Sequence, residues 1–247
     1  MNIQLKNWDN FCNYHTGDWK GSKKRYSPEG KVIRTWDVIT HLHLNQDQSE
    51  ITHQDELFYS DGTNEVKNYG IYKKPQTSAL FLDSTFCWGS KIVKPDAIFI
   101  FEFGFRYEDK RVLCYFRYDE TGTLQYSSTG IEYLNNKDTQ QNKNNHAELK
   151  KADETWIGSL QKMTTDKVIS EPIKTNWKSI KELNKDYLIQ DLGDNIIVTC
   201  PKIVEQNQSF LIGVDWQIND ELLKRGIVYY EASELSYFTV ETFTPVN

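Results

Sequence analysis

The feature that most constrains the fold is a series of short strand-like runs, each ended by residues that favour turns. The strongest turn signal is Asp61-Gly62, a pair typical of two-residue β-hairpins. No long amphipathic helical pattern separates the runs, and strands spaced in this way are typical of a β-sandwich or a β-barrel. The runs cover residues 18–27, 31–44, 50–60, 63–74, 84–93, 97–107, 110–119 and 123–134, and further β-rich runs begin at residue 155.

Three histidines, His41, His43 and His53, have a spacing on adjacent strands that superficially matches a three-histidine zinc site. The alternation of apolar residues in the two strands argues against such a site. It places His53 opposite Leu42 and on the inward, apolar face, whereas the other two histidines face outward. We therefore expect no metal site, and we interpret His41 and His43 as solvated edge residues.

The hairpin formed by residues 97–107 and 110–119 has two very different faces. One face is almost entirely aromatic and aliphatic, which suits either a dry core or the wall of an apolar cavity. The other face carries Glu102 opposite Tyr115 and diagonal to Arg117, close enough for a hydrogen-bonded charge pair. That face is either a solvent-exposed salt bridge of little energetic value or a surface that grips the polar end of a ligand. The sequence leaves open which face points inward.

Aromatic residues are unusually abundant, with 7 Trp, 14 Tyr and 12 Phe making up 13% of the 247 residues. This content excludes a wholly disordered chain. The length suits one large domain, two small ones or a single barrel. The formal net charge of −6, from 29 Lys and Arg against 35 Asp and Glu, gives no general electrostatic reason to bind nucleic acid or an anionic membrane.

The four cysteines include no CxxC pair, which excludes a zinc ribbon and a thioredoxin motif. The N-terminus lacks the basic and apolar stretches of a secretory signal. The longest apolar run, residues 97–105, is interrupted by Glu102 and is too short for a membrane helix. We therefore expect a cytoplasmic protein with four free thiols and no transmembrane segment.

Residues 135–154 break the β pattern, because they are rich in Asn, Gln and Lys and contain few apolar residues. We interpret them as a polar mobile loop or linker. Residues 1–134 would then form the N-terminal part of a barrel, and residues 155–247 would form strands that complete or flank it. The best internal helix candidate is residues 174–184, whose apolar residues recur on one helical face.

Motifs that assign a reaction are missing from the sequence. It contains no nucleophile elbow, P-loop, dinucleotide-binding glycine fingerprint or HExxH motif, and no pair of carboxylates stands out as general acid and base. The catalytic residues are therefore unknown from the sequence, and no cofactor is expected.

A family resemblance rests on several short segments. The segment Gly17-Asp18-Trp19-Lys20-Gly21 is similar to the Gly-x-Trp signature of lipocalins and other calycins. Together with further segments it resembles the lipocalin-like (calycin) family of uncharacterised proteins found mainly in cyanobacteria. Those segments are Trp8, Phe11, RYSPEG at 25–30, EITH at 50–53, YSDG at 59–62, FRYEDKR at 105–111, YDETG at 118–122, FLIGVDWQI at 210–218, Lys224-Arg225 and FTVETF at 238–243.

The resemblance implies a barrel that the tryptophan closes at one end, packed near an Arg or Lys from a late strand. Gly17, Trp19 and Gly21 would be the structural residues of this closure. The sequence departs from the family pattern at Thr40 and Val228, where the family carries basic residues. The positions that match are Trp19, His53, Glu102, Arg106, Arg111, Arg225 and Glu241.

We therefore expect an all-β fold, a lipocalin-like antiparallel β-barrel with a short N-terminal helix and additional C-terminal strands. Barrels of this size can hold one small ligand. The leading hypothesis is that the barrel binds a hydrophobic small molecule: a fatty acid, isoprenoid, carotenoid or linear tetrapyrrole. The expected ligand-binding residues are His53, Tyr59, Glu102, Arg106, Tyr115, Arg117 and Arg225.

Two alternatives remain open at this point. The first is an enzyme, a cyclase, isomerase or bilin-lyase-like protein, in which His53 with Asp55 or Glu102 with Tyr115 acts as an acid–base pair. The second is a protein-interaction scaffold whose barrel is filled by its own side chains. A protein partner would accompany the scaffold, and a phycobiliprotein partner would accompany a bilin lyase.

Overall fold

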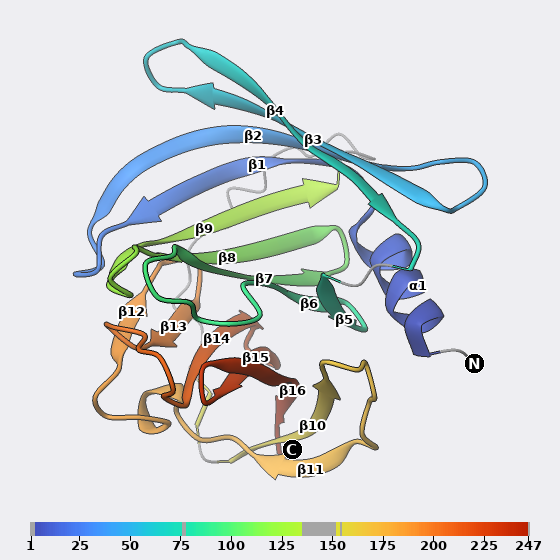
Figure 1. The fold of residues 1–247 in the computed structure, drawn as a ribbon. Coiled ribbons are helices and arrows are strands. Elements are labelled where there is room, and N and C mark those ends of the chain that lie inside the picture. The colour runs from blue at the N-terminus through green and yellow to red at the C-terminus, as the bar shows by residue number, and fades with distance from the viewer. Residues whose placement is uncertain (1–2, 76–77, 135–151, 154, 247) are drawn as a thin grey trace.

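The computed structural model describes residues 3–75, 78–134, 152–153 and 155–246. Helix α1 (Ile3–His15) is followed by a nine-stranded antiparallel sheet, called sheet A here, and then by a seven-stranded antiparallel sheet, called sheet B. Figure 1 shows that sheet A is strongly curled and that sheet B packs beside it. Sheet A has the order β4-β3-β2-β1-β9-β8-β7-β6-β5, with β1 Gly17–Tyr26, β2 Val32–Leu44, β3 Glu50–Tyr59, β4 Asn64–Lys73, β5 Ala79–Leu82, β6 Thr85–Gly89, β7 Phe99–Tyr107, β8 Lys110–Tyr118 and β9 Leu124–Leu134.

Sheet B is formed by the C-terminal strands. A short 3₁₀ helix, η1 (Ile180–Glu182), lies between two of these strands in the chain. Its order is β11-β10-β16-β15-β14-β13-β12, with β10 Trp156–Thr164, β11 Ile173–Asn176, β12 Leu188–Asp191, β13 Ile196–Cys200, β14 Phe210–Asn219, β15 Leu222–Glu231 and β16 Glu234–Pro245. The expected fold class is confirmed, since the chain is mostly β with one short N-terminal helix and a barrel-like curled sheet. The additional C-terminal strands flank that sheet as a sheet of their own.

The main hydrophobic core lies between the two sheets. The aromatic face of the β7–β8 hairpin, including Phe101, Phe103 and Phe105, packs there against sheet B residues such as Trp216 and Phe238. The opposite face of the same hairpin points into the curl of sheet A. This arrangement decides the question that the sequence left open: the phenylalanine face is dry core, and the face with Glu102 lines a cavity.

Helix α1 lies against sheet A because its buried residues recur at helical spacing. Trp8, Phe11 and His15 are all buried, and they lie on one side of the helix. Phe11 stacks on Phe81 of β5 with 4.5 Å between ring centroids. Asn10 Nδ2 also donates to the Phe81 carbonyl over 3.0 Å. The helix is therefore fixed to the β5 edge of the sheet.

Trp19 is fully buried where β1 leaves the helix. Its Nε1 donates to the His15 carbonyl over 3.0 Å, and the Arg111 guanidinium lies 4.5 Å above its ring. Gly21, two residues on, is required by a close approach of β1 to β9: a Cβ there would lie 1.8 Å from the Ile131 carbonyl oxygen. Trp19 and Gly21 thus allow β1 to pair with β2 on one side and with β9 on the other.

Several further predictions can be compared with the structure. The expected pairings of His53 with Leu42 and of Glu102 with Tyr115 are confirmed. All four cysteines are free. No helix in the described part of the chain is both long and apolar enough to cross a bilayer.

The predicted helix over residues 174–184 is wrong. Its first residues belong to β11, which pairs with β10, and only η1 is helical. Backbone pairing with a neighbouring strand, which the local pattern does not record, outweighed the helical spacing. The predicted loop over residues 135–154 lies almost entirely outside the described residues.

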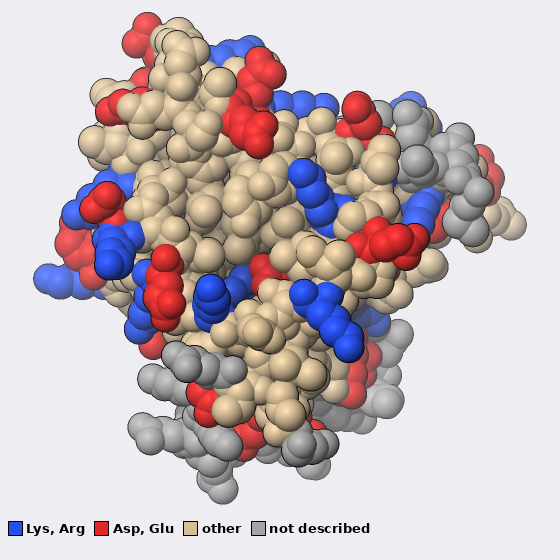
Figure 2. All heavy atoms as spheres, turned by 90° about the horizontal axis from the view of Figure 1, so that it is seen from below, with Lys and Arg blue, Asp and Glu red and all other residues tan. Residues whose placement is uncertain are grey.

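Figure 2 shows one face of the molecule with basic and acidic side chains interspersed among uncharged ones. The described residues on this face form no large area of a single charge. This mixture agrees with the small net charge of the chain.

Candidate functional site: a cavity inside the curled sheet

A cavity of about 600 Å³ occupies the interior of sheet A. All nine strands and helix α1 contribute to its lining, because alternate residues of each strand face the inside of the curl. Its wall is largely aromatic, and the aromatic lining residues are Phe11, Trp36, Tyr59, Tyr69, Tyr72, Phe81, Phe86, Trp88, Tyr115 and Tyr126. Pockets of this volume with apolar walls and a few polar groups are typical of small-molecule sites.

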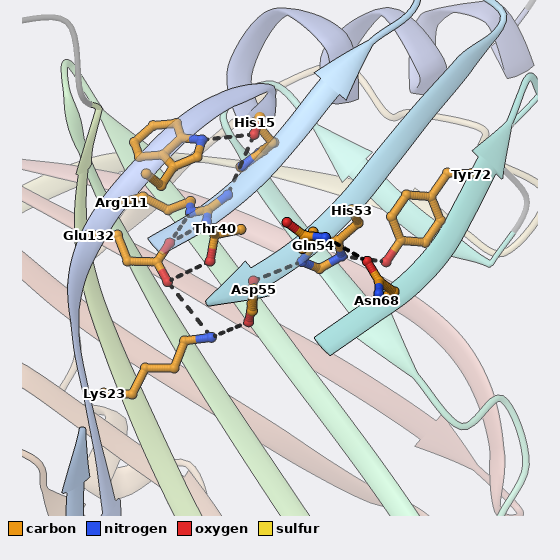
Figure 3. A network of polar contacts seen from close by, with 11 residues as sticks. His15, Lys23, Thr40, His53, Gln54, Asp55, Asn68, Tyr72, Arg111 and Glu132 are labelled. Carbon is orange, nitrogen blue, oxygen red and sulfur yellow. Dashed lines mark hydrogen bonds and ion pairs between the residues drawn. The ribbon is translucent and has the colours of Figure 1, made fainter. Parts of the chain in front are cut away.

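Near helix α1, a buried ion pair joins Arg111 of β8 to Glu132 of β9 (Figure 3). Arg111 Nε donates to Glu132 Oε2 over 2.9 Å, and its Nη1 donates to the His15 carbonyl over 3.5 Å. Thr40 of β2 donates to the other Glu132 oxygen over 3.5 Å. The pair therefore ties the end of the helix to three strands of the cavity wall.

Lys23 of β1 extends this network toward β3 and β4 (Figure 3). Its Nζ donates to Asp55 Oδ2 over 3.1 Å and lies 3.8 Å from Glu132 Oε1. His53 Nε2 lies 3.2 Å from Asp55 Oδ1, and His53 Nδ1 lies 2.9 Å from the Tyr72 hydroxyl. Burial disfavours the charged form of Asp55, but the hydrogen bond from His53 and the charge of Lys23 outweigh it and hold the pKa below its usual range. The cavity thus has a polar wall whose members already satisfy one another.

Glu102 of β7 differs from the other acidic groups of the cavity. It forms no hydrogen bond to any residue that the structure describes. Burial raises its pKa to about 7, although the positive charges of Lys23 and Arg111 act in the opposite direction. The negative charges of Glu132 and Asp55 add to the increase. Glu102 can therefore exchange a proton near neutral pH.

His15, at the end of α1, is the second lining residue with unused hydrogen-bonding capacity. It is only 1% exposed, and neither ring nitrogen has a hydrogen-bond partner among the described residues. Burial lowers its pKa well below the usual value, and the charge of Arg111 lowers it further. The imidazole is therefore neutral, with one donor and one acceptor, and its ring packs edge-on against Phe86 at 4.9 Å.

The end of the cavity away from α1 carries two arginines stacked on aromatic rings. The Arg25 guanidinium lies 4.0 Å from the Tyr126 ring centroid and 5.6 Å from that of Trp36. Arg34 lies 4.3 Å above the Tyr59 ring. Arg25 Nε is buried and has no hydrogen-bond partner among the described residues. This end can therefore bind an anionic group.

Four of the residues expected to bind a ligand line the cavity: His53, Tyr59, Glu102 and Tyr115. Arg106, Arg117 and Arg225 do not. Arg106 instead donates to the carbonyls of Asn13 and Tyr14 at the end of α1, over 3.3 and 2.8 Å. Arg117 lies outside the cavity lining.

Arg225 lies in sheet B, away from the cavity. It forms a buried two-bond ion pair with Asp215, with Nε–Oδ1 and Nη2–Oδ2 distances of 2.6 and 2.8 Å. Glu241, which the resemblance also pointed to, lies opposite Arg225 on β16. Both residues therefore belong to the structure of sheet B rather than to the candidate site.

Sequence reasoning missed several members of the site, namely His15, Lys23, Arg25 and Glu132. One signal was present: Lys23 and Arg25 alternate with Trp19 and so share its inward face. His15 and Glu132 had no such signal, because their place in the site depends on the docking of α1 and on the pairing of β1 with β9.

The interpretation of His41 and His43 as edge residues is wrong. They face outward as expected, but β2 lies between β1 and β3 in the middle of a sheet. Both also contact Asp18 of β1 rather than solvent alone. His53 lies on the other face, so the three histidines do not converge.

The fold and the site define a class of protein: a curled antiparallel β-sheet that encloses a cavity of ligand size. Residues 4–135, more than half of the chain, match the family described as "Domain of unknown function (DUF3598), N-terminal". The chain belongs to the DUF3598 family.

Among solved structures, a DUF3598 protein of unknown function from Nostoc punctiforme PCC 73102 is similar over 97% of this chain and 99% of its own, with a TM-score of 0.71 and 18% identity. This likeness shows the fold alone. Two others have low scores and carry no functional argument: Rv2717c from M. tuberculosis (TM-score 0.26, 8% identity, 100% and 99% coverage) and an S-type phycobiliprotein lyase from Guillardia theta (TM-score 0.22, 7% identity, 99% and 96% coverage). No curated protein matches the chain.

Proposed function

We propose that the protein binds a hydrophobic small molecule carrying a polar group in the cavity of sheet A. The observation that carries the proposal is a ligand-sized cavity with aromatic walls, which is lined by a buried His15 ring without a hydrogen-bond partner among the described residues and by the half-buried carboxyl group of Glu102. Buried polar groups without partners are costly in a folded protein unless something else satisfies them. A ligand hydroxyl, carbonyl or ring nitrogen would satisfy both.

The two ends of the cavity favour some ligands over others. Arg25 and Arg34 at the end away from α1 suit a carboxylate, and the aromatic wall suits an unsaturated body. Fatty acids and linear tetrapyrroles carry carboxylates, whereas hydrocarbon carotenoids and most isoprenoids do not. Fatty acids and linear tetrapyrroles are therefore the preferred classes. The cavity also argues against a scaffold with a filled barrel.

The remaining expectations from the sequence fit this proposal. Trp19, packed beneath Arg111, supports the lipocalin-like classification that its motif suggests. Four free thiols, three of them buried, agree with a cytoplasmic location, where thiols stay reduced.

The first test is native mass spectrometry and an absorption spectrum of the protein purified from its own cells. An added mass or a visible band is expected and identifies the ligand class. The identified ligand, or a fluorescent polyene fatty acid if none is retained, is then titrated into two variants of adjacent residues. Leu57→Trp places a larger side chain in the cavity and should weaken binding, whereas Phe58→Trp faces outward and should bind like the wild type. Equal affinity of both variants would contradict the proposal.

A second candidate function is an enzyme that acts on such a ligand. Two observations favour it: the pKa of Glu102 near 7, and the hydrogen bond between His53 and Asp55. General acids and bases work best with a pKa near the working pH. Turnover of the bound ligand, lost in Glu102→Gln while binding is retained, would establish this function. A ligand recovered unchanged after prolonged incubation would leave the protein a carrier.

A further inference from the structure

On the outer face of sheet A, away from the cavity, three potential metal ligands converge on one point. His41 Nδ1 lies 2.6 Å from Asp18 Oδ1, and His43 Nε2 lies 2.7 Å from the same oxygen. The ligand atoms of all three residues lie within 4.8 Å of one another. Two imidazoles therefore already share one carboxylate oxygen.

The register of β1 and β2 produces this convergence. Asp18 lies directly opposite His41 in the antiparallel pair. His43 is two residues further along β2 and therefore on the same face of the sheet. The backbone of two paired strands thus holds the three side chains together, which gives the cluster a rigid base.

A fourth residue, Glu56 of β3, contacts the cluster on the side of His41 that faces away from Asp18. Its Oε1 lies 3.3 Å from His41 Nε2, the ring nitrogen that points away from Asp18. Histidines that bind a metal usually donate their other ring N–H to a carboxylate or carbonyl, which fixes the tautomer and strengthens the ligand. The contact to Glu56 therefore leaves Nδ1 of His41 as the nitrogen available to a metal.

We propose that Asp18, His41 and His43 bind a divalent transition-metal ion of the zinc class, with Glu56 as the residue that orients His41. Two imidazoles and a carboxylate suit zinc, nickel or copper, whereas magnesium and calcium prefer oxygen ligands. The remaining coordination positions would be taken by water or by a donor from outside the chain. This site faces away from the cavity, and the inference is independent of the proposed function.

The geometry needs only a small adjustment to hold an ion. Ligand atoms bound to zinc at about 2.0–2.2 Å in a tetrahedron are roughly 3.3 Å apart, so the side chains would separate by roughly 0.7 Å. His43 and Asp18 are free to make this movement, because their side chains are 57% and 44% exposed. On binding, the metal ion would take the place of the protons that the three side chains now share.

The test is isothermal titration of ZnCl₂ into the untagged, full-length protein after treatment with a chelator. We expect one ion per chain in the wild type. His43→Ala and Asp18→Asn, both at exposed positions, should each weaken binding at least tenfold, and Glu56→Gln should weaken it by about ten- to a hundredfold. The matched control is Glu120→Gln, which changes an exposed carboxylate in the turn between β8 and β9 and should not affect zinc binding.

A second readout does not depend on affinity. Copper(II) bound to the wild type should give an electron paramagnetic resonance spectrum with coupling to two nitrogens, reduced to one in His43→Ala. Circular dichroism without metal checks that each variant is folded. The proposal is overturned if the wild type binds no zinc, if the double variant His41→Ala/His43→Ala still binds it like the wild type, or if Glu120→Gln loses binding equally.

Discussion

Glu102 is the residue that makes the cavity sensitive to pH near neutrality. Its pKa of about 7 contrasts with the lowered pKa of Asp55, a carboxyl group in the same cavity that Lys23 and His53 keep ionised. At about pH 6 one carboxyl group is therefore mostly protonated while the other is charged. The first can donate a hydrogen bond to a ligand, and the second can only accept one.

The free energy of unfolding should also depend on pH because of the raised pKa of Glu102. Glu102 has its pKa raised by burial, so between about pH 4.5 and 7 the folded state binds more protons than the unfolded state, and stability falls as the pH rises through this window. Glu102→Gln removes the effect. At about pH 8 the variant should be about 2 kcal/mol more stable than the wild type, after allowance for the part of the side chain that faces the cavity.

Urea unfolding at about pH 5 and pH 8 measures this difference. The control is the exposed residue Glu120, whose change to Gln should leave the pH profile of the wild type unchanged. A Glu102→Gln variant that keeps the wild-type profile would show that Glu102 is ionised throughout.

Arg225 should matter for stability and not for the ligand. Replacing it with Met leaves the buried carboxylate of Asp215 without its partner, at a cost of about 3–5 kcal/mol. The matched change Lys73→Met breaks an exposed ion pair with Glu50 and should cost less than about 1 kcal/mol. Chemical denaturation gives both values. Loss of ligand affinity in folded Arg225→Met would instead return this arginine to the binding site.

The cavity residues that were predicted from the sequence differ from those that were missed in whether a local pattern determines their position. His53 and Tyr59 follow from the alternation of side chains within a single hairpin, which is a local property. The same alternation separates the two faces of the β7–β8 hairpin but does not say which of them lines the cavity, so the place of Glu102 had to come from the structure. Arg225 lies outside the cavity, in sheet B, and a basic residue in a strand gives no sign of which sheet the strand will join. His15 was missed because the docking of a helix on β5 leaves no local pattern.

Among the elements, strand β1 depends most on a single small residue. A Cβ at Gly21 would lie 1.8 Å from the Ile131 carbonyl oxygen and 2.7 Å from the Glu132 Cα, both backbone atoms of β9 that cannot rotate away. Gly21→Ala should therefore destabilise the protein by about 3 kcal/mol or more, by forcing β1 and β9 apart.

The control for this prediction is Gly62→Ala, at a turn with φ of +83° and open space around the Cβ position. Only the backbone conformation is strained there, so the expected cost is about 1 kcal/mol. Thermal unfolding of both variants measures the difference. Similar losses in the two would mean that β1 and β9 can separate without breaking the sheet.

The segment around η1 shows why a helical pattern can fail. Ile180 is buried as a helix would require, and its side chain occupies the space beside Gly213 that a Cβ there would crowd. The preceding residues, however, pair with β10 from Ile157 to Leu160. Strand β11 itself is almost entirely exposed, and of this segment only Ile180, in the short turn that follows, enters the core. Hairpins with strong turn signals, in contrast, were predicted correctly because both partners are close in sequence.

At the scale of the whole molecule, the two sheets share one core and should unfold together. Phe103 of sheet A lies 6.0 Å from Phe238 of sheet B, and both are fully buried. Phe103→Ala should cost about 3–5 kcal/mol. The exposed residue Ile157 provides the control, since Ile157→Ala should cost less than about 1 kcal/mol.

Hydrogen exchange with mass spectrometry distinguishes joint from separate unfolding. In Phe103→Ala, amides of β2 and of β15 should lose protection by the same factor. Loss confined to one sheet would mean that the two sheets are independent folding units.

Sheet A ends at β4 on one side and at β5 on the other, and among the described residues these two strands are not hydrogen-bonded to each other. In a closed barrel the number of strands and their stagger fix the circumference. A sheet whose two edge strands are not paired with each other has no such constraint. Its circumference can increase or decrease when β4 moves relative to β5, and no backbone hydrogen bond between paired strands has to break. The volume of the cavity can therefore change while the hydrogen-bonded ladders on either side of this gap stay intact.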